Sequence, residues 1–382
     1  MAALPQRAEV VIVGGGAVGA SIACQLARAG CTDVVVLDAG GLGDGSSGKP
    51  LGGLRAQFSD HLNIALAARS LEVYSRMAQE GALALDRVGY LFLLRTPGQV
   101  KRLQGSVALQ NELGVPSRML EPEEARALCP LIDPDRYVAA TFSPSDGYAP
   151  PRQAILAWAA EARRRGVRIV PHCEVRDIEV RGNEVAAVCT DEGTVATSVV
   201  ICAAGPWSAR IGAMAGVALD VAPVRRQITF TEPRPGGHPR VPFTIDLQTS
   251  FYFHNAGQQL LLGYSDPRQA PSFDRAYTED WLDDLRRLAR ECAPSLAQLP
   301  FVGGWAGLYE QTPDSNALIG EAPHVSRFLY ATGFSGHGFS QAPAAGEIIC
   351  DLVLGRTPFI DITPLRAERF AQQAPIREIT IV

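Results

Sequence analysis

Apolar runs and amphipathic stretches alternate along the early part of the chain. An apolar run at 9–13 leads into glycines, and a helical period of apolar positions follows at 17–29. A second apolar run occupies 34–38, and after a polar loop at 39–59 the helical period returns at 62–78. Short apolar runs that alternate with longer amphipathic ones predict a parallel sheet whose two faces are covered.

The middle of the chain continues this pattern with shorter elements. It predicts a strand at 89–94, a short helix opened by Pro-Glu-Glu at 122–124, and a helix at 150–165 that a glycine ends. A strand at 168–171 follows, and then a meander that ends in an apolar run at 197–203. These elements extend the α/β character of the beginning.

The stretch 217–300 has a different pattern of apolar positions. Three short β-like runs lie at 227–231, 250–254 and 259–263, and one amphipathic helix follows at 280–292. Consecutive strands without helices between them favour an antiparallel sheet, so this stretch is predicted to build a separate subdomain.

From residue 301 the α/β pattern returns, with a strand at 328–331, a glycine loop and a helix at 341–354. The predicted fold class is therefore α/β combined with α+β: a Rossmann-type nucleotide-binding domain with an interleaved antiparallel-sheet domain for the substrate. We expect the nucleotide-binding domain to comprise residues 1–85, 145–216 and 301–382, and the substrate-binding domain to comprise residues 86–144 and 217–300.

Composition excludes several classes of function. With 382 residues, 47% hydrophobic and 20% charged, the chain is typical of a globular protein with ample core. A formal net charge of -5 without a polybasic run does not indicate a basic surface that would bind nucleic acid or an anionic membrane. No apolar stretch reaches the ~18 residues of a membrane helix. The eight cysteines form no Cys-x-x-Cys pair and the six histidines no ligand pair, so we expect no metal site and a cytoplasmic location.

The glycine turn after the first predicted strand carries the clearest chemical signal. Residues 14–19 read Gly-Gly-Gly-Ala-Val-Gly, which matches G-x-G-x-x-G between a strand and a helix. Asp38, at the end of the next predicted strand, is placed to receive ribose hydroxyls, and an acid there disfavours a 2′-phosphate. This context favours a dinucleotide over a merely glycine-rich turn, although the motif alone does not separate FAD from NAD.

Three later segments bear on which dinucleotide is bound. The Gly-Ser-Ser-Gly at 45–48 offers small donors for a pyrophosphate or a flavin edge, and a flexible surface loop is the competing interpretation. The strand that ends in Ala-Ala-Gly-Pro-Trp at 203–207 suits close approach of a cofactor, but taken alone it also suits core. The glycine loop at 333–339 contains Phe334 and Phe339, which are too apolar to prefer water, and the helix after it would aim its N-terminus at the pyrimidine end of a flavin.

With these segments in register, the sequence resembles the D-amino-acid oxidase-like flavoproteins, especially members similar to sarcosine oxidase, its β subunit and glycine oxidase. The resemblance covers nearly the whole chain. It rests on the fingerprint with Asp38, on Ser46 and Ser47, on Gly-Leu-Arg-Ala-Gln-Phe at 53–58, on 203–207, on Trp-Ala-Gly-Leu-Tyr-Glu-Gln-Thr-Pro-Asp at 305–314, and on the 333–339 loop.

The resemblance implies an FAD domain, a substrate domain with a large sheet, and oxidation of a C–N bond beside the flavin. Together with the motifs it gives a set of candidate FAD-binding residues: Gly14, Gly16, Ala17, Val18, Gly19, Asp38, Ala39, Ser46, Ser47, Gly48, Val175, Ala204, Gly205, Trp207, Gly307, Gly333, Gly336, His337, Gly338, Phe339 and Ser340.

Departures from the family pattern shape two further expectations. Gly307 stands where monomeric sarcosine oxidases carry the cysteine that tethers the flavin, so we expect non-covalent FAD. Leu261 and Ser340 stand where those enzymes carry active-site lysines, one of which promotes reaction with oxygen. The chain has only Lys49 and Lys101, and neither is an obvious substitute. A dehydrogenase that passes electrons to another redox partner therefore gains weight over an oxidase that uses oxygen.

The expected reaction is hydride transfer from a carbon beside the nitrogen of a small neutral amine or amino acid, resembling sarcosine, proline or glycine, to flavin N5. The imine then hydrolyses. Arg55 matches the arginine that binds the substrate carboxylate in sarcosine oxidase, Tyr252 would wall the pocket, and His337 would contact flavin or substrate. Two alternatives remain open: an FAD-dependent 2-hydroxy-acid dehydrogenase, and an FAD-binding assembly factor that acts by binding partners.

Overall fold

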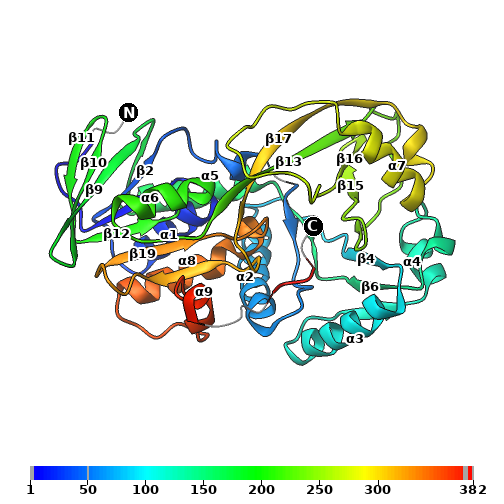
Figure 1. Ribbon diagram of the computed structural model, residues 1–382, viewed down its shortest axis with the longest axis horizontal. Helices are drawn as coiled ribbons and strands as arrows, with labels where there is room; N and C mark the ends of the chain where they lie inside the picture. Colours follow the sequence, from blue (N-terminus) through cyan, green and yellow to red (C-terminus); the bar gives the residue numbers. More distant parts are fainter. Residues whose placement is uncertain (1–3, 50, 373–376, 381–382) are drawn as a thin grey trace.

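Two large β-sheets lie side by side in the molecule, one toward each end of its long axis (Figure 1). The computed structural model describes residues 4–49, 51–372 and 377–380. A six-stranded sheet and an eight-stranded sheet form the frame, and the chain passes between them more than once. Among the described residues, no helix combines the length and apolar character that crossing a bilayer requires.

The six-stranded sheet is the predicted nucleotide-binding core. Its strands read as apolar runs, such as the Val-Val-Ile-Val of β1, because both faces of the sheet are covered. All neighbouring strands are parallel except β18, which runs antiparallel at one edge. In spatial order the strands are β18 (Leu318–Glu321), β19 (Phe328–Thr332), β12 (Val199–Cys202), β1 (Val10–Val13), β2 (Val34–Asp38) and β8 (Arg168–Pro171).

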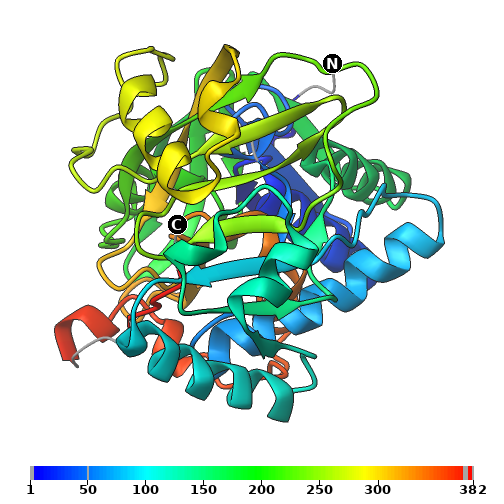
Figure 2. The same cartoon turned by 90° about the vertical axis from the view of Figure 1, so that its right-hand side faces the viewer.

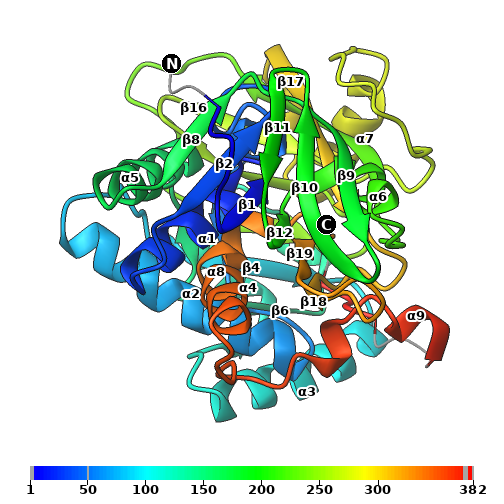
Figure 3. The same cartoon turned by 90° about the vertical axis from the view of Figure 1, so that its left-hand side faces the viewer.

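Helices cover one face of this sheet, and a small sheet covers the other (Figure 3). The small residues of α1 and α8 let these helices approach closely: a Cβ at Gly346 would lie 2.4 Å from Ser21 Oγ. The predicted covering of both faces is confirmed. One layer consists of α1 (Ala17–Arg28), α2 (His61–Gln79), α5 (Pro151–Arg164) and α8 (Gly338–Val353), and the other of β9 (Val175–Arg181), β10 (Glu184–Thr190), β11 (Gly193–Ala196) and α6 (Ser208–Met214).

The eight-stranded sheet is antiparallel except for the parallel pair β14 and β4. Helices α7 (Leu282–Cys292) and α4 (Pro122–Leu128) pack on the face turned away from the six-stranded sheet (Figure 2). On the other face, the segment 97–112 covers one end through Leu103, and the rest borders the space between the two sheets. In spatial order the strands are β17 (Phe301–Gln311), β13 (Ala222–Thr231), β16 (Gln259–Gly263), β15 (Tyr252–Ala256), β14 (Phe243–Asp246), β4 (Tyr90–Leu94), β6 (Ala139–Ser143) and β5 (Arg118–Leu120).

Several elements differ from the sequence-based expectation. Strand β17 pairs along its length with β13 in the eight-stranded sheet, whereas the expected domain bounds assign residues 301–311 to the nucleotide-binding domain. The predicted antiparallel sheet also contains one parallel pair. Helix α3 (Pro97–Glu112) was not predicted, although the Thr96 capping box and the proline after it announce its start. Helix α8 starts at Gly338, before the predicted 341. The division into two domains otherwise stays a prediction.

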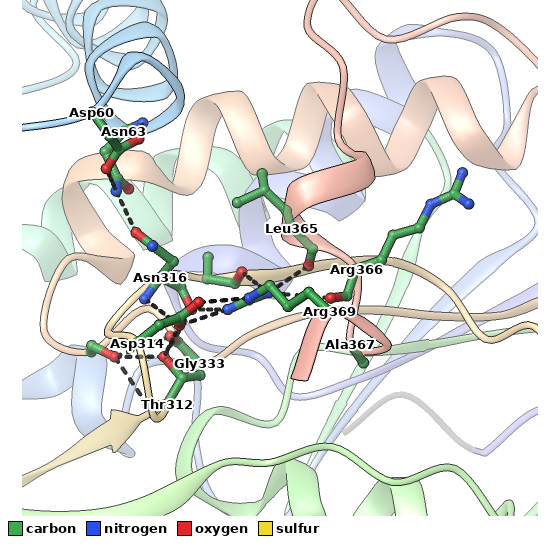
Figure 4. A network of polar contacts seen from close by, with 12 residues as sticks. Asp60, Asn63, Thr312, Asp314, Asn316, Gly333, Leu365, Arg366, Ala367 and Arg369 are labelled. Atoms are coloured by element: carbon green, nitrogen blue, oxygen red, sulfur yellow. Dashed lines mark hydrogen bonds and ion pairs between the residues drawn. The ribbon is translucent and has the colours of Figure 1, made fainter. Parts of the chain in front are cut away.

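A buried ion pair anchors the turn after β17 (Figure 4). Arg369, at the start of α9 (Arg369–Gln372), donates to both carboxylate oxygens of Asp314 at 2.7 and 2.9 Å and to the carbonyl of Asn316 at 2.8 Å. The amide of Asn63 in α2 donates to Asn316 Oδ1, and Thr312 Oγ1 lies 3.2 Å from Ser335 Oγ. This network joins α2, α9 and the 333–338 loop, and it therefore positions that loop. A two-stranded ribbon of β3 (Gly53–Leu54) and β7 (Gly147–Tyr148) completes the fold.

Candidate functional site

A cavity of about 560 Å³ lies between the carboxyl ends of the six-stranded sheet and the inner face of the eight-stranded sheet. It is lined by residues that follow three parallel strands, Gly14 after β1, Ala39 after β2 and Ala204 after β12, and also by Tyr252 of β15. Crevices at the carboxyl ends of parallel strands, where the strand order reverses, are the usual ligand sites of open α/β sheets. Here β1 lies between β2 and β12, so the cavity opens at such a point.

The glycine turn has the geometry that a dinucleotide needs. Gly14 has φ +110°, and a Cβ there would lie 2.3 Å from the carbonyl oxygen of Ala203. A Cβ at Gly19 would lie 1.9 Å from the carbonyl oxygen of Gly14, so this glycine lets α1 pack on β1. Only glycine fits at these two positions. The turn thus delivers the N-terminus of α1, which begins at Ala17, to the cavity.

Asp38 closes the turn from the neighbouring strand. Its carboxylate accepts hydrogen bonds from the backbone N–H groups of Gly15 at 2.6 Å and Gly40 at 2.8 Å. Burial raises the pKa of Asp38, and the two hydrogen bonds oppose that shift. The carboxylate therefore holds the end of β2 against the glycine turn while it lines the cavity, where it suits ribose hydroxyls and repels a 2′-phosphate.

Two serines complete the wall beside the α1 N-terminus. Ser47 Oγ accepts a hydrogen bond from the backbone N–H of Ala17 at 3.0 Å. Ser46 Oγ is buried and has no hydrogen-bond partner within the described part of the chain, although its residue lines the cavity. A buried hydroxyl without a partner is costly unless a ligand satisfies it. This orphaned donor, with the helix N-terminus beside it, fits the pyrophosphate of FAD.

Most of the candidate cofactor residues line this one cavity. Gly19, Gly48 and Gly333 do not, and each instead permits a close approach of backbone or side chain: a Cβ at Gly48 would lie 2.2 Å from the Gly43 carbonyl oxygen. The candidates that do line the cavity are Gly14, Gly16, Ala17, Val18, Asp38, Ala39, Ser46, Ser47, Val175, Ala204, Gly205, Trp207, Gly307, Gly336, His337, Gly338, Phe339 and Ser340.

Arg55 lines the cavity, but its guanidinium is already engaged by the protein. Nη1 donates to the carbonyl of Gln57 and to Thr380 Oγ1, and Nη2 donates to the Thr380 carbonyl at 2.8 Å. Nη2 also lies 2.8 Å from Nε2 of His337. The group packs 4.0 Å over the ring of Phe58, and the residue is 4% exposed. The guanidinium is therefore not free to bind a substrate carboxylate, which is the role that the resemblance implies for Arg55.

His337 is held as a neutral imidazole by this arrangement. Burial lowers its pKa well below the ordinary value, and the charge of Arg55 lowers it further. Because an arginine can only donate, Nε2 of His337 must accept, which leaves the ring proton on Nδ1. The lone pair of Nε2 is thus occupied, so His337 orients Arg55 instead of serving as a base. Ser340 likewise exchanges hydrogen bonds with the backbone of Arg55.

The eight-stranded sheet contributes the other wall. On β13 and β17 the cross-strand partners are Arg226 with Gly307 and Ile228 with Trp305, and all four residues line the cavity. Tyr252 of β15 lies on the same wall, is 2% exposed, and has a pKa raised well above its ordinary value by burial. The predicted place of Tyr252 in the pocket wall agrees with this position.

Several cavity residues were missed by the sequence reasoning, among them Arg226, Glu310 and Lys49. Glu310 is an acid inside a strand; its carboxylate accepts from Thr332 Oγ1 at 2.9 Å and from the backbone of Gly333 at 3.0 Å, and burial raises its pKa to about 7. The signal was an acid inside an apolar strand. Lys49 also lines the cavity, where its Nζ donates to the carbonyl of Ala306 at 2.9 Å. Its position directly after the Ser-Ser-Gly segment was the available clue.

Comparison with known proteins places this geometry among flavoenzymes. The chain is 30% identical over 380 residues to 4-methylaminobutanoate oxidase (formaldehyde-forming) of Paenarthrobacter nicotinovorans, with 96% of this chain and 46% of the relative covered. It is 28% identical to glycine oxidase of Geobacillus kaustophilus, with 96% and 98% covered. The structure of L-proline dehydrogenase from P. horikoshii superposes with a TM-score of 0.91 at 32% identity, with 97% and 99% covered.

The chain spans less than half the length of the first of these relatives, 46% of it. A model of one protein family, described as FAD dependent oxidoreductase (DAO), matches residues 9–352. That match includes both the glycine turn and the loop at the start of α8. Both segments line the cavity, and the chain belongs to the FAD dependent oxidoreductase family.

Proposed function

We propose that the protein oxidises the C–N bond of a small amine or amino acid and leaves an imine that water hydrolyses. The observation that carries this proposal is the continuity of the cavity. One space is lined both by the nucleotide-binding residues Gly14 and Asp38 and by Tyr252 and Ile228 of the eight-stranded sheet. A substrate held against that sheet would share the cavity with the cofactor.

The residues that would hold FAD are those at the carboxyl ends of the parallel strands. We assign the pyrophosphate to the α1 N-terminus with Ser46, the ribose to Asp38, and the flavin to the region between Gly307 and the start of α8 at Gly338. Because Gly307 has no side chain, we propose that the cofactor is not covalently attached there. FAD, when bound, accepts a hydride from the carbon beside the substrate nitrogen.

The chain itself supplies orientation, desolvation and charge control. The sheet wall that holds Tyr252 is largely apolar, with Phe243 and Ile245 beside it. An ammonium ion is disfavoured in such a wall, and the buried cations Arg55 and Arg226 disfavour it further. A neutral amine keeps the nitrogen lone pair that drives hydride departure. Little acid–base machinery is required, which agrees with a His337 whose Nε2 is engaged.

We propose a redox carrier other than oxygen as the electron acceptor. Leu261 is buried in the sheet and, among the described residues, stays outside the cavity lining, whereas the resemblance places an oxygen-promoting lysine at that position. Lys49 does reach the cavity, but its ammonium is hydrogen-bonded to the Ala306 carbonyl. We also propose a cytoplasmic location, because all eight cysteines are free thiols, as is usual in a reducing compartment.

Anaerobic titration of the purified flavoprotein tests donor and acceptor in one experiment. Sarcosine, L-proline, glycine and D-alanine are added in turn, and lactate serves as the hydroxy-acid control. The proposal expects at least one amine to bleach the flavin absorbance while lactate does not. Admission of oxygen should then restore the colour slowly, and a dye such as dichlorophenolindophenol rapidly. Bleaching by lactate alone would support the hydroxy-acid alternative, and no bleaching by any donor would support the assembly-factor alternative.

A further inference from the structure

Four arginines of the described residues line the cavity. Arg210 and Arg275 lie over the rings of Phe273 and Trp207. The other two, Arg55 and Arg226, have opposite surroundings. Arg55 makes three hydrogen bonds to protein oxygen atoms and contacts a histidine nitrogen, as described above. Arg226 makes a single hydrogen bond within the described part of the chain, from Nη1 to the carbonyl of Arg225 at 3.2 Å. Its Nε is buried and has no partner there. One guanidinium is saturated and the other is open.

No carboxylate of the described residues neutralises Arg226 in an ion pair. The acid whose charge acts on it, Asp266, is held by Arg268, with Oδ1 to Nε and Oδ2 to Nη2 at 2.9 and 3.0 Å. Arg226 instead lies 5.4 Å from the ring centre of Tyr309. A partly buried guanidinium without an anion is costly, and this cost is removed when an anionic ligand arrives.

The sheet register explains why Arg226 reaches the cavity. On β13, Arg226 and Ile228 face the same side, because side chains two apart share one face of a strand. Both line the cavity, and the cross-strand partner of Arg226 is Gly307, which has no side chain to cover the guanidinium. The neighbouring Arg225 does not line this cavity and pairs with Asp274 at 2.9 Å.

We propose that Arg226 binds the carboxylate of the substrate, and that the protein therefore acts on amino acids, amines that carry a carboxylate close to the nitrogen. This assignment builds on the proposed function and names its substrate class. A planar guanidinium with free donors matches a carboxylate as a two-point fork. Arg226 would determine which carbon of the amine faces the cofactor. Arg55 would stabilise the same wall through its hydrogen bonds to the protein.

The test is equilibrium binding of a carboxylate that cannot donate a hydride. Pyrrole-2-carboxylate and its neutral analogue pyrrole-2-carboxamide are titrated into the oxidised flavoprotein, and the change in flavin absorbance gives Kd. Arg226→Met should raise Kd for the carboxylate by roughly 10- to 150-fold, the worth of a charge-assisted contact. Kd for the carboxamide should change by less than about 3-fold. Arg225→Met is the matched control and should leave both values unchanged.

Several results would overturn the assignment. In the first, the wild-type protein binds the carboxylate no more tightly than the carboxamide. In the second, Arg226→Met raises Kd for both ligands equally. In the third, Arg225→Met raises Kd for the carboxylate as much as Arg226→Met does. If Arg226→Met does not retain FAD, Arg226→Gln carries the same comparison. Since these titrations need no turnover, they are independent of the proposed reaction. Selective loss of carboxylate binding in a protein that no amine reduces would retain the anion site and reject the proposed function.

Discussion

Replacement of Arg55 by methionine should damage stability more than substrate recognition. The change leaves Thr380 Oγ1, the carbonyl of Thr380 and the imidazole of His337 without a donor in a buried site. The carbonyl of Gln57 keeps only a hydrogen bond from Thr380 Oγ1 at 3.4 Å. It also removes the cation that acts on the buried carboxylate of Glu378. Each unsatisfied buried group costs about 1–3 kcal/mol, and loss of one partner from a buried charged network costs about 3–5 kcal/mol.

We therefore expect Arg55→Met to lower the free energy of unfolding by about 3–5 kcal/mol. For 382 residues the entropy of unfolding is about 0.8 kcal/mol/K, which converts this loss to a decrease in Tm of about 4–6 °C. Thermal unfolding of the flavoprotein, followed by circular dichroism at one scan rate, measures the shift.

Arg28→Met supplies the control for this measurement. Arg28 forms an ion pair with Glu161 at 2.7 Å, and its side chain is 40% exposed, so its loss should cost less than about 1 kcal/mol. A Tm of Arg55→Met equal to that of Arg28→Met, combined with loss of pyrrole-2-carboxylate binding, would refute the reasoning. Arg55 would then be the residue that binds the substrate carboxylate.

Three further predictions follow from other parts of the structure. Glu310 keeps its proton in the folded state up to pH about 7 and in the unfolded state up to its ordinary pKa of 4.5, so stability should fall by about 3 kcal/mol as pH rises through this window. In Glu310→Gln, Tm measured from pH 4.5 to 7.5 should lose this slope, and an unchanged slope would contradict the assignment. Asp314→Asn leaves Arg369 buried without its anion and should lower stability by about 3 kcal/mol in urea unfolding, whereas a shift below about 1 kcal/mol would show that the pair is dispensable. Because Gly307 cannot tether FAD, acid precipitation should leave the yellow colour in the supernatant, and a yellow pellet would disprove non-covalent binding.

Local signals explain why much of the fold was predictable. The run of 34–38 and the run of 168–171 became strands with the expected bounds, because a continuous apolar stretch between turn residues has few other ways to be buried. The glycine turn could also be assigned from the sequence, because the φ of +110° at Gly14 and the contact of Gly19 with Gly14 involve residues that are close together in the chain. The sheet that contains β17 could not be predicted, because β17 pairs with β13, a segment that is distant along the chain.

The sequence by itself determined the βαβ unit, the acid that answers the glycine turn, and the resemblance that led to FAD. These depend on residues that are near one another along the chain or on motifs of fixed spacing. Only the tertiary structure decided which arginine is available to a ligand. Arg55 is saturated by Thr380, which lies 325 residues away, whereas Arg226 faces a glycine on the next strand and stays open. Hydrogen-bond saturation is a property of the folded surroundings, so no pattern at positions 55 or 226 alone can reveal it.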